Sequence, residues 1–265
     1  MHKLAIIGNP VAHSLSPLIW HEFARQTKIE LEYIKIEAPV IEFEKLAQEF
    51  FRSGGKAINI TAPFKARAFA LAKMHNQHAL GSQTANLLIN TNTGLEADNT
   101  DGLGLVADLS RMNLNLHGKN ILIIGSGSVI YSVLSSLAAE KPARIDLLMR
   151  DTSKLIEFQA KSSLIKAYSQ DIAYDLVINT TPNNPVNELF ANIQQLAVNA
   201  LAYDMSYTAK QTLFMATMEQ INAQVIQANG IGMLIQQAKV GFQLVFGVMP
   251  EVESLYTLLR GKLNG

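Results

Sequence analysis

The stretch KNILIIGSGSVI (residues 119–130) decides how this chain is expected to fold. Its apolar run at residues 121–124 is typical of a strand that is buried on both faces of a parallel sheet. A glycine-rich turn follows at residues 125–128, and an apolar helix is expected over residues 129–139. A strand, a glycine turn and a helix in this order can bind a dinucleotide pyrophosphate on the free N–H groups of the helix N-terminus. A G-x-G turn also ends many strands that bind nothing, so the motif alone leaves both interpretations open.

The alternation of strands and helices continues on both sides of this stretch. The remaining strands are expected at residues 3–7, 32–37, 57–60, 87–90, 145–149, 164–167, 176–179, 201–204 and 224–227. The remaining helices are expected at residues 17–27, 39–52, 63–74, 100–112, 153–160, 212–221, 230–246 and 250–263. Such alternation predicts an α/β protein whose parallel sheets are covered by helices. We expect an N-terminal α/β domain to about residue 100, then a Rossmann-like, doubly wound nucleotide-binding domain, with a ligand cleft between them.

The composition excludes several classes of partner and chemistry. Of the 265 residues, 48% are hydrophobic, which is enough for a sizeable core. Lys plus Arg and Asp plus Glu both number 22, and no block of like charge argues for a nucleic acid or a membrane surface. Cysteine is absent, which excludes disulfides and thiolate chemistry. The N-terminal apolar run is too short for a signal peptide, and no stretch approaches the roughly 18 apolar residues of a membrane helix, so a cytoplasmic protein is expected.

Several short stretches place polar side chains at the ends of apolar elements. In the N-terminal half they are NPVAHSLSP (9–17), INITAPFK (58–65), TANLL (84–88) and DNTDG (98–102). Later in the chain, YDMSY (203–207) and NGIGMLIQQA (229–238) accompany the GSGS turn. These stretches occur in the order and at the spacing found in shikimate dehydrogenases. The chain therefore resembles the shikimate dehydrogenase family over nearly its whole length.

The resemblance implies a catalytic pair, Lys65 in the PFK stretch and Asp101 in the NTDG stretch. Reduction of a ketone by hydride leaves an alkoxide, which needs a proton and a nearby positive charge. An ammonium group can supply both, and a carboxylate beside it can hold the amine and a substrate hydroxyl. From residue types alone, a solvated lysine in the first turn of a helix and a helix-capping aspartate remain open alternatives.

The resemblance also assigns a set of substrate-binding side chains: Ser14, Ser16, Thr61, Lys65, Asn86, Asp101, Tyr207 and Gln237. Ser14 and Ser16 would hold the substrate carboxylate, since hydroxyls at a helix N-terminus suit an anion. Ser16 is also a natural N-cap before Pro17. Tyr207 and Gln237 would close over the substrate from the second domain. A half-buried tyrosine and a surface glutamine are the alternatives for these two.

The cofactor is expected to be NADP. The stretch MRDTSK (149–154) follows a predicted strand, and family members that use NADP carry N-R-T-x-x-[RK] here. Arg150 and Lys154 are retained and could pair with the 2′-phosphate, whereas Asp151 could weaken that site or contact a ribose. The other cofactor-binding candidates are Gly125, Ser126, Gly127, Ser128, Thr180 and Gly230.

Three features depart from the family pattern. Bulky Val129 and Ile130 stand where small residues normally let the helix approach the cofactor, which predicts looser cofactor binding. Residues 179–183 (NTTPN) stand where the family often has a glycine. Leu87 replaces a threonine beside the substrate-binding Asn86. No metal is expected, because His75 and His78, three apart on a possible helix, are better explained as surface histidines than as ligands.

The resemblance implies reversible, NADPH-dependent reduction of 3-dehydroshikimate to shikimate in the chorismate pathway to aromatic amino acids. The alternatives are an NAD-dependent quinate/shikimate dehydrogenase and a non-catalytic protein that binds shikimate or a dinucleotide. Residues 1–100 would bind substrate, residues 101–235 would bind NADP, and helices within residues 236–265 would pack back onto the first domain. The expected partner is the small-molecule substrate, and the expected assembly is a monomer or a homodimer.

Overall fold

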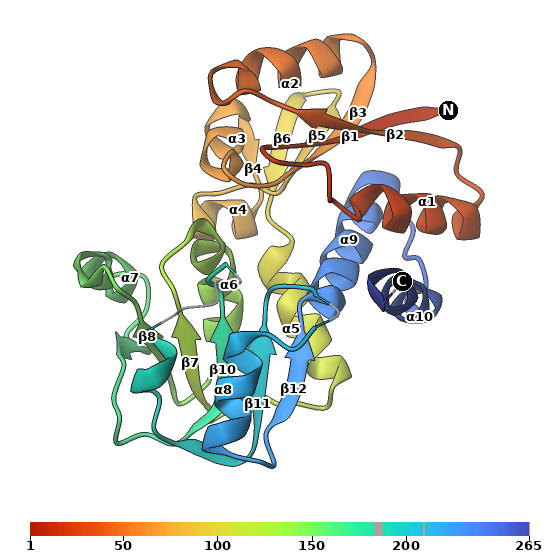
Figure 1. Ribbon diagram of the computed structural model, residues 1–265. Helices are drawn as coiled ribbons and strands as arrows, with labels where there is room; N and C mark the ends of the chain where they lie inside the picture. The colour runs from red at the N-terminus through yellow and green to blue at the C-terminus, as the bar shows by residue number, and fades with distance from the viewer. Residues whose placement is uncertain (183–187, 209, 265) are drawn as a thin grey trace.

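Each half of the chain builds its own six-stranded sheet. The structure, a computed structural model, describes residues 1–182, 188–208 and 210–264, so residues 183–187 of the predicted loop lie outside it. Figure 1 shows two α/β bodies, one above the other, with helices between them. The predicted class, two α/β bodies with the nucleotide-binding type second, is confirmed.

The first sheet has the order β2-β1-β3-β5-β6-β4. Its strands are β1 (His2–Gly8), β2 (Leu31–Glu37), β3 (Gly55–Ile60), β4 (Met74–His75), β5 (Leu87–Thr91) and β6 (Gly94–Asp98). The predicted parallel pairing holds for β1 with β2 and β3 and for β4 with β6, whereas β5 runs antiparallel to both β3 and β6. The β5–β6 ladder continues up to the pair Thr91 and Gly94, which leaves a two-residue turn. So tight a connection forces the second strand to run back along the first.

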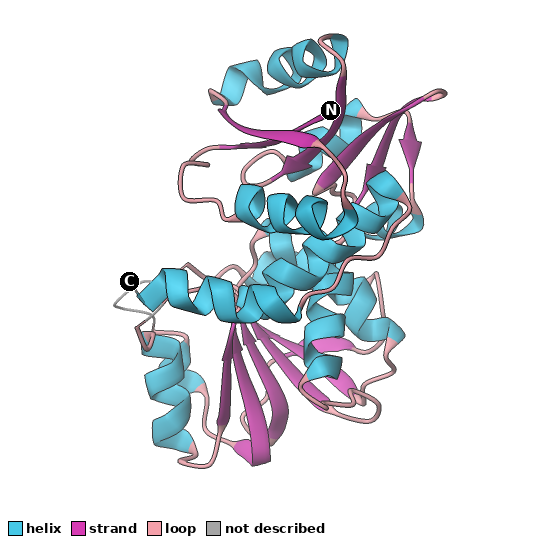
Figure 2. Cartoon of the chain, turned by 90° about the vertical axis from the view of Figure 1, so that its right-hand side faces the viewer, coloured by secondary structure: helices cyan, strands magenta, loops and turns pink. Residues whose placement is uncertain are grey.

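Helices cover both faces of this sheet, as Figure 2 shows. They are α1 (Ser16–Thr27), α2 (Phe43–Arg52), α3 (Lys65–Leu71), α4 (Gln77–Ser82), α9 (Ile231–Phe246) and α10 (Glu253–Asn264). Alternate residues of a strand face opposite layers. Leu4 and Ile6 of β1 therefore join a core with α1, α9 and α10, whereas Ala5 and Ile7 join a core with α2 and α3. The helix predicted over residues 63–74 is shorter, and α4 was not predicted.

The second sheet is parallel in all pairings of its described strands and has the order β12-β11-β10-β7-β8-β9. Its strands are β7 (Asn120–Ile124), β8 (Arg144–Leu148), β9 (Ile165–Ala167), β10 (Tyr174–Asn179), β11 (Leu196–Asp204) and β12 (Ile226–Asn229). Its helices are α6 (Ser128–Ala139), α7 (Leu155–Gln159) and α8 (Leu213–Ile221). The strand order reverses between β7 and β10, which is the doubly wound arrangement. Ligands bind such sheets at the carboxyl ends of the strands beside this reversal.

Two helices, α5 (Asp101–Arg111) and α9, pack against each other between the two bodies (Figure 1). They come very close at Gly104, where an added Cβ would lie 2.6 Å from the backbone N of Gln237. The domain boundary predicted at residue 235 falls inside α9. Both helices therefore place side chains at the junction of the bodies. None of the helices in the described part of the chain combines the length and apolarity needed to cross a membrane.

Candidate active site

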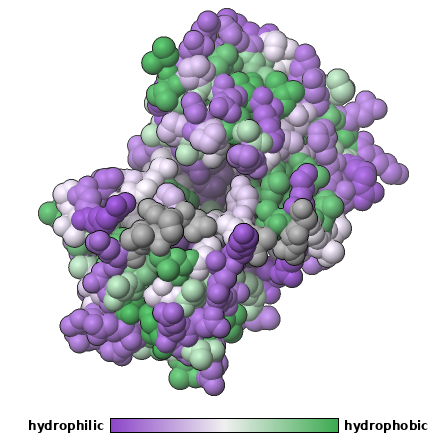
Figure 3. All heavy atoms as spheres, viewed as in Figure 1, coloured by the Kyte–Doolittle hydropathy of each residue, from purple (hydrophilic) through white to green (hydrophobic). Residues whose placement is uncertain are grey.

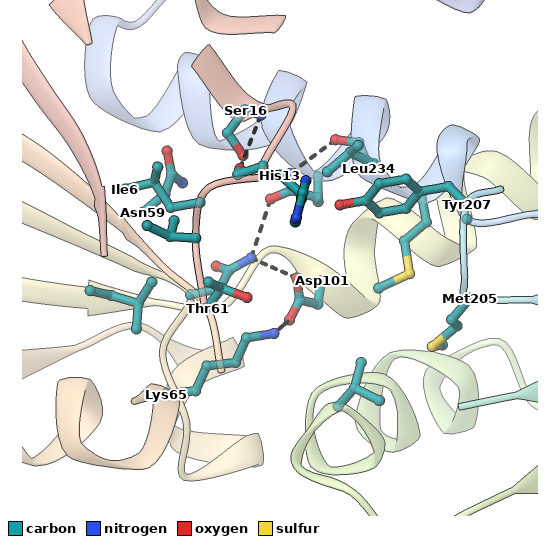
Figure 4. Close-up of a pocket in the computed structure, with 18 of the residues that line it drawn as sticks. Ile6, His13, Ser16, Asn59, Thr61, Lys65, Asp101, Met205, Tyr207 and Leu234 are labelled. Carbon is teal, nitrogen blue, oxygen red and sulfur yellow. Dashed lines mark hydrogen bonds and ion pairs between the residues drawn. The ribbon is translucent and has the colours of Figure 1, made fainter. Parts of the chain in front are cut away.

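A cavity of about 400 Å³ lies between the two bodies. Its volume falls in the range of small-molecule sites. Figure 3 shows the surface hollowed here, with polar residues on its floor. Its lining includes every residue assigned to the substrate: Ser14, Ser16, Thr61, Lys65, Asn86, Asp101, Tyr207 and Gln237. Figure 4 shows Lys65 and Asp101 reaching into this space from one side and Tyr207 from another.

Lys65 and Asp101 form an ion pair in the cavity wall. Lys65 Nζ lies 2.5 Å from Asp101 Oδ2, and the two side chains are only 13% and 9% exposed. Each is the first residue of its helix, Lys65 of α3 and Asp101 of α5. The lysine is therefore not a solvated first-turn residue. A partly buried pair of this kind places one proton donor and one fixed negative charge at the cavity surface.

Asn86 holds the carboxylate of Asp101 from the other side. Asn86 Nδ2 donates to Asp101 Oδ1 at 2.8 Å, and Asn86 Oδ1 accepts from the backbone N–H of Thr100 at 2.9 Å. The same amide nitrogen lies 3.3 Å from Gln237 Oε1, which connects it to α9. Gln237 is thus not a free surface residue. The two carboxylate oxygens of Asp101 have different partners, so its orientation is fixed.

Ser14 and Ser16 meet at the N-terminus of α1. The prediction that Ser16 caps this helix is wrong, because the helix begins at Ser16 and Leu15 occupies the cap position without a side-chain bond. The Ser16 N–H instead donates to Ser14 Oγ at 3.2 Å. Ser16 lines the cavity, and its hydroxyl forms a hydrogen bond with that of Tyr33. Two hydroxyls at a helix N-terminus suit a carboxylate.

The glycine turn of the second body has the backbone that a dinucleotide site requires. Gly125 has φ +117°, and a Cβ there would lie 2.4 Å from Thr180 Oγ1, so only glycine fits. Gly127 precedes α6 in an extended conformation, and no described atom lies within 4 Å of a Cβ built on it. No side chain within the described residues caps α6. The N-terminus of α6 therefore begins at an exposed turn and has no described side chain capping it.

Comparison with known proteins decides the family. A family model described as the shikimate dehydrogenase substrate binding domain matches residues 6–88. A relative from Herminiimonas arsenicoxydans, named shikimate dehydrogenase (NADP(+)), is 37% identical over 269 residues, which cover 98% of each chain. A relative of the same name from Nitrosomonas europaea is 36% identical and covers 100% of this chain and 99% of its own. The chain belongs to the shikimate dehydrogenase family.

Solved structures share the fold of this chain. An Ael1 enzyme from Pseudomonas putida superimposes with a TM-score of 0.86 at 30% identity and 98% coverage of both chains. Shikimate dehydrogenase from Thermus thermophilus, solved with shikimate, has a TM-score of 0.87 at 22% identity and covers all of both chains. The second similarity concerns the fold, which the two proteins share from end to end.

Two of the residues that depart from the shikimate dehydrogenase pattern are fully buried and do not line the cavity. Ile130 belongs to the core of the second body. Leu87 is also fully buried, in the core beneath α1 and α9, and it is not part of the cavity lining. Val129 behaves differently, because it does line the cavity. The expectation that Leu87 alters the substrate surroundings is wrong, since its side chain packs behind Asn86.

Of the side chains expected near a 2′-phosphate, Lys154 contacts the glycine turn. Arg150 lies two residues after the end of β8 and is exposed, and Lys154 Nζ lies 3.5 Å from the carbonyl oxygen of Ser126. Asp151 is engaged in its own loop, where it accepts from Ser153 N at 3.1 Å and Ser153 Oγ at 2.5 Å. These hydrogen bonds lower the pKa of Asp151. Two basic side chains beside open N–H groups fit a phosphorylated dinucleotide.

The last two cofactor candidates, Thr180 and Gly230, lie at the carboxyl ends of the strands of the second sheet. Thr180 Oγ1 donates to the carbonyl of Ile124 at 2.8 Å, which ties the end of β10 to the end of β7. Gly230 lies against Met205, since an added Cβ would be 2.1 Å from the Met205 carbonyl oxygen. Gly230 also lines the cavity. These two residues shape the edge of the sheet, where a cofactor would cross from the second body to the cavity.

Two polar residues of the cavity were not assigned from the sequence. Asn59 is 7% exposed and accepts a hydrogen bond from the Tyr33 hydroxyl at 2.7 Å. It is two residues before Thr61, and residues two apart in an extended chain share a face, so this signal was available. The second is His13, an exposed residue that projects into the cavity (Figure 4). Its position follows from the path of the loop before α1.

Tyr207 lines the cavity and its ring packs at the edge of the first core. Burial raises the pKa of its hydroxyl above the usual value. The hydroxyl therefore stays protonated at neutral pH and is able to donate a hydrogen bond.

The possible helix containing the histidines at positions 75 and 78 is not present. His75 lies in β4 and His78 in α4, because the chain is extended between α3 and α4. His78 Nδ1 lies 3.3 Å from Asp98 Oδ1. Within the described residues no three His, Asp or Glu side chains are grouped as they would be around a metal ion.

Proposed function

We propose that this chain is an NADP-dependent shikimate dehydrogenase that interconverts 3-dehydroshikimate and shikimate in aromatic amino acid biosynthesis. The observation that carries the proposal is the Lys65–Asp101 ion pair in the wall of a cavity shared by both bodies. The likeness to relatives of that name over their full length supports it. In this proposal residues 1–100 bind the substrate, residues 101–235 bind NADP, and the C-terminal helices within residues 236–265 complete the first domain.

The substrate would be held by polar groups from opposite walls of the cavity. Ser14 and Ser16 would bind its carboxylate at the N-terminus of α1. Thr61, Asn86 and Asp101 would bind the ring hydroxyls, because all three have oxygen or amide groups on the same wall as Lys65. Tyr207 and Gln237 would contact the ring from the other side. Fixing the ring between two walls limits it to one orientation toward the catalytic pair.

The catalytic pair handles the proton. NADPH, when bound, supplies the hydride that adds to the ketone carbon. The Lys65 ammonium then donates its proton to the ketone oxygen as that oxygen gains electrons, so no free alkoxide is formed. Asp101 keeps the ammonium in place, and Asn86 fixes Asp101. In the reverse direction the Lys65 amine accepts the proton of the substrate hydroxyl.

The cofactor would bind along the edge of the second sheet. Gly125, Ser126, Gly127 and Ser128 would receive the pyrophosphate at the N-terminus of α6. Arg150 and Lys154 would hold the 2′-phosphate, which favours NADP over NAD. Thr180 and Gly230 would border the path to the cavity. The engagement of Asp151 with Ser153 supports this preference, because that carboxylate is not directed at a ribose.

The proposal is tested by following nicotinamide absorbance with shikimate or quinate and NADP or NAD in all four pairings. We expect shikimate with NADP to give the highest kcat/KM. Turnover with quinate and NAD alone would contradict the proposal in favour of a quinate dehydrogenase. A lack of turnover in every pairing, with shikimate still bound in calorimetry, would instead indicate a non-catalytic binding protein.

A further inference from the structure

Behind the proposed catalytic pair lies a buried cluster of four polar side chains, Ser82, Thr84, Asn99 and Ser132. Their exposed fractions are only 1%, 5%, 3% and 4%. Three of them come from the first body or the start of α5, whereas Ser132 belongs to α6 of the second body. None of the four lines the cavity. We call this group the Asn99 cluster.

Asn99 is the centre of the cluster, and both hydrogens of its side-chain amide form hydrogen bonds within it. Asn99 Nδ2 donates to Thr84 Oγ1 and to Ser132 Oγ, both at 2.8 Å. An amide NH₂ group has two hydrogens, so these two contacts account for both. Asn99 Oδ1 accepts from the backbone N–H of Asp101 at 3.2 Å. One side chain thus connects the backbone of Asp101 to helix α6.

The cluster also reaches the other residues of the proposed catalytic site. Thr84 is followed by Ala85, whose N–H donates to the carbonyl of Lys65 at 2.9 Å, and then by Asn86. The backbone segments that carry Lys65, Asn86 and Asp101 are therefore all bonded directly to the cluster or to its nearest neighbours.

On the opposite side, Ser132 lies one turn into α6, whose first residue is Ser128. Helices α5 and α6 are in backbone contact here, because a Cβ on Gly102 of α5 would lie 2.4 Å from the carbonyl oxygen of Ser132 on α6. Figure 1 shows α6 running beneath α4 and beside α5 at this point.

Stability alone does not account for this arrangement. Replacing both partners of a buried hydrogen bond by apolar groups of the same shape is often close to neutral. A fully satisfied polar cluster differs from apolar packing mainly in that it fixes one relative position of the groups that it joins. The groups joined here are the helix proposed to receive the cofactor and the segment that carries Asp101.

We propose that Asn99, Thr84 and Ser132 are positioning residues, which set the placement of Asp101 relative to α6 and thereby the approach of substrate to cofactor. The inference rests on the proposed function. Positioning matters because a displacement of about 1 Å can cost roughly a hundredfold in rate. The cluster touches neither ligand site, so its loss affects the reaction step more than the binding of shikimate.

Four variants test the inference. Ser132→Ala removes the acceptor on α6, and Thr84→Val removes the second acceptor at constant shape. Thr84→Ser keeps that hydroxyl and serves as the conservative control. Ser135→Ala removes an exposed hydroxyl from the same helix and controls for helix content. Each variant is first checked for its thermal unfolding midpoint and for shikimate affinity by calorimetry.

We expect Ser132→Ala and Thr84→Val to lower kcat roughly 2- to 10-fold, the range that one buried hydrogen bond represents. Their dissociation constants for shikimate should stay within about twofold of the parent value. With shikimate deuterated at the carbon that is oxidised, the isotope effect on kcat should rise, because the hydride step becomes slower. Hydrogen exchange should also accelerate at the Asp101 amide, whose acceptor is Asn99. Thr84→Ser and Ser135→Ala should resemble the parent in all of these measurements.

The inference is overturned if kcat and the isotope effect in Ser132→Ala and Thr84→Val equal those of the parent. It is also overturned if only the unfolding midpoint changes, since that result describes a purely structural cluster. A parent chain that turns over neither substrate contradicts the proposed function itself. An active parent with unaffected variants contradicts the positioning role alone.

Discussion

Replacing Lys65 by Met tests the chemistry most directly. Methionine keeps most of the length and the apolar stem of the side chain but removes the ammonium group. A general acid contributes about 10² to 10⁴ in rate, so we expect kcat to fall by that factor, or by about 3 to 5 kcal/mol in activation free energy. The side chains of the pair are only 13% and 9% exposed, so the partner carboxylate loses its counter-charge in a poorly solvated place. We expect an accompanying loss of unfolding free energy of about 3 kcal/mol or less.

A double variant tests whether Lys65 and Asp101 act together. Asp101→Asn leaves Lys65 without its 2.5 Å partner, and we expect it to lower kcat by at least about tenfold. Because residues that act as one unit are not additive, Lys65→Met/Asp101→Asn should be no more than about tenfold slower than the slower single variant. Steady-state kcat with saturating shikimate and NADP gives the rates, and calorimetry shows whether shikimate still binds. The reasoning is refuted if Lys65→Met keeps kcat within tenfold of the parent, or if the two losses multiply.

Three further predictions concern the cofactor turn and the buried tyrosines. Gly125→Ala should lower the unfolding free energy in urea by about 1 to 3 kcal/mol, because φ is +117° and the new Cβ would meet Thr180. Gly127→Ala, at an ordinary φ of −73°, should unfold like the parent, and equal midpoints for the two variants would contradict this. Arg150→Ser should raise the NADP dissociation constant about tenfold and leave that of NAD within twofold, and equal losses for both would exclude a 2′-phosphate contact. Burial raises the pKa of Tyr33 and Tyr203 well above the ordinary value, so the unfolded chain loses these protons first and stability should fall above about pH 10. Urea titrations from about pH 8 to about pH 11 test this, and stability that is constant across that range would contradict it.

The strands of the second sheet were predictable because they are short runs of apolar residues, which indicate a buried strand without information about neighbouring strands. Ile121 and Ile123 face one helical layer, and Leu122 and Ile124 face the other, so every residue of the run is buried. β6 was missed for the opposite reason. Its sequence contains Glu96 and Asp98, and its pairing depends on the tight turn after β5. Such a strand is stabilised by its neighbours in the sheet, which local periodicity does not reveal.

The candidate site was predictable only through the resemblance to a family. Lys65 and Asp101 each begin a helix, where the same residue types usually serve as solvated or capping groups. They are poorly exposed because they pair with each other at the junction of the two bodies, where α5 and α9 pass at backbone contact. The Asn99 cluster was not predicted at all. Asn99 and Ser132 are far apart in sequence, and neither belongs to a pattern that suggests a hydrogen bond between them.

The bulky residues Val129 and Ile130, which follow the glycine turn, occupy different surroundings in the structure. Successive residues of a helix point about 100° apart, so Val129 and Ile130 cannot both face the turn. Ile130 is fully buried in the core beneath the sheet, where a large apolar side chain stabilises the second body. Val129 instead lines the cavity, at the end of α6 that faces the substrate wall. The two bulky residues therefore act in different places. The size of residue 129 therefore bears on the cavity wall, whereas the size of residue 130 bears on the core of the second body.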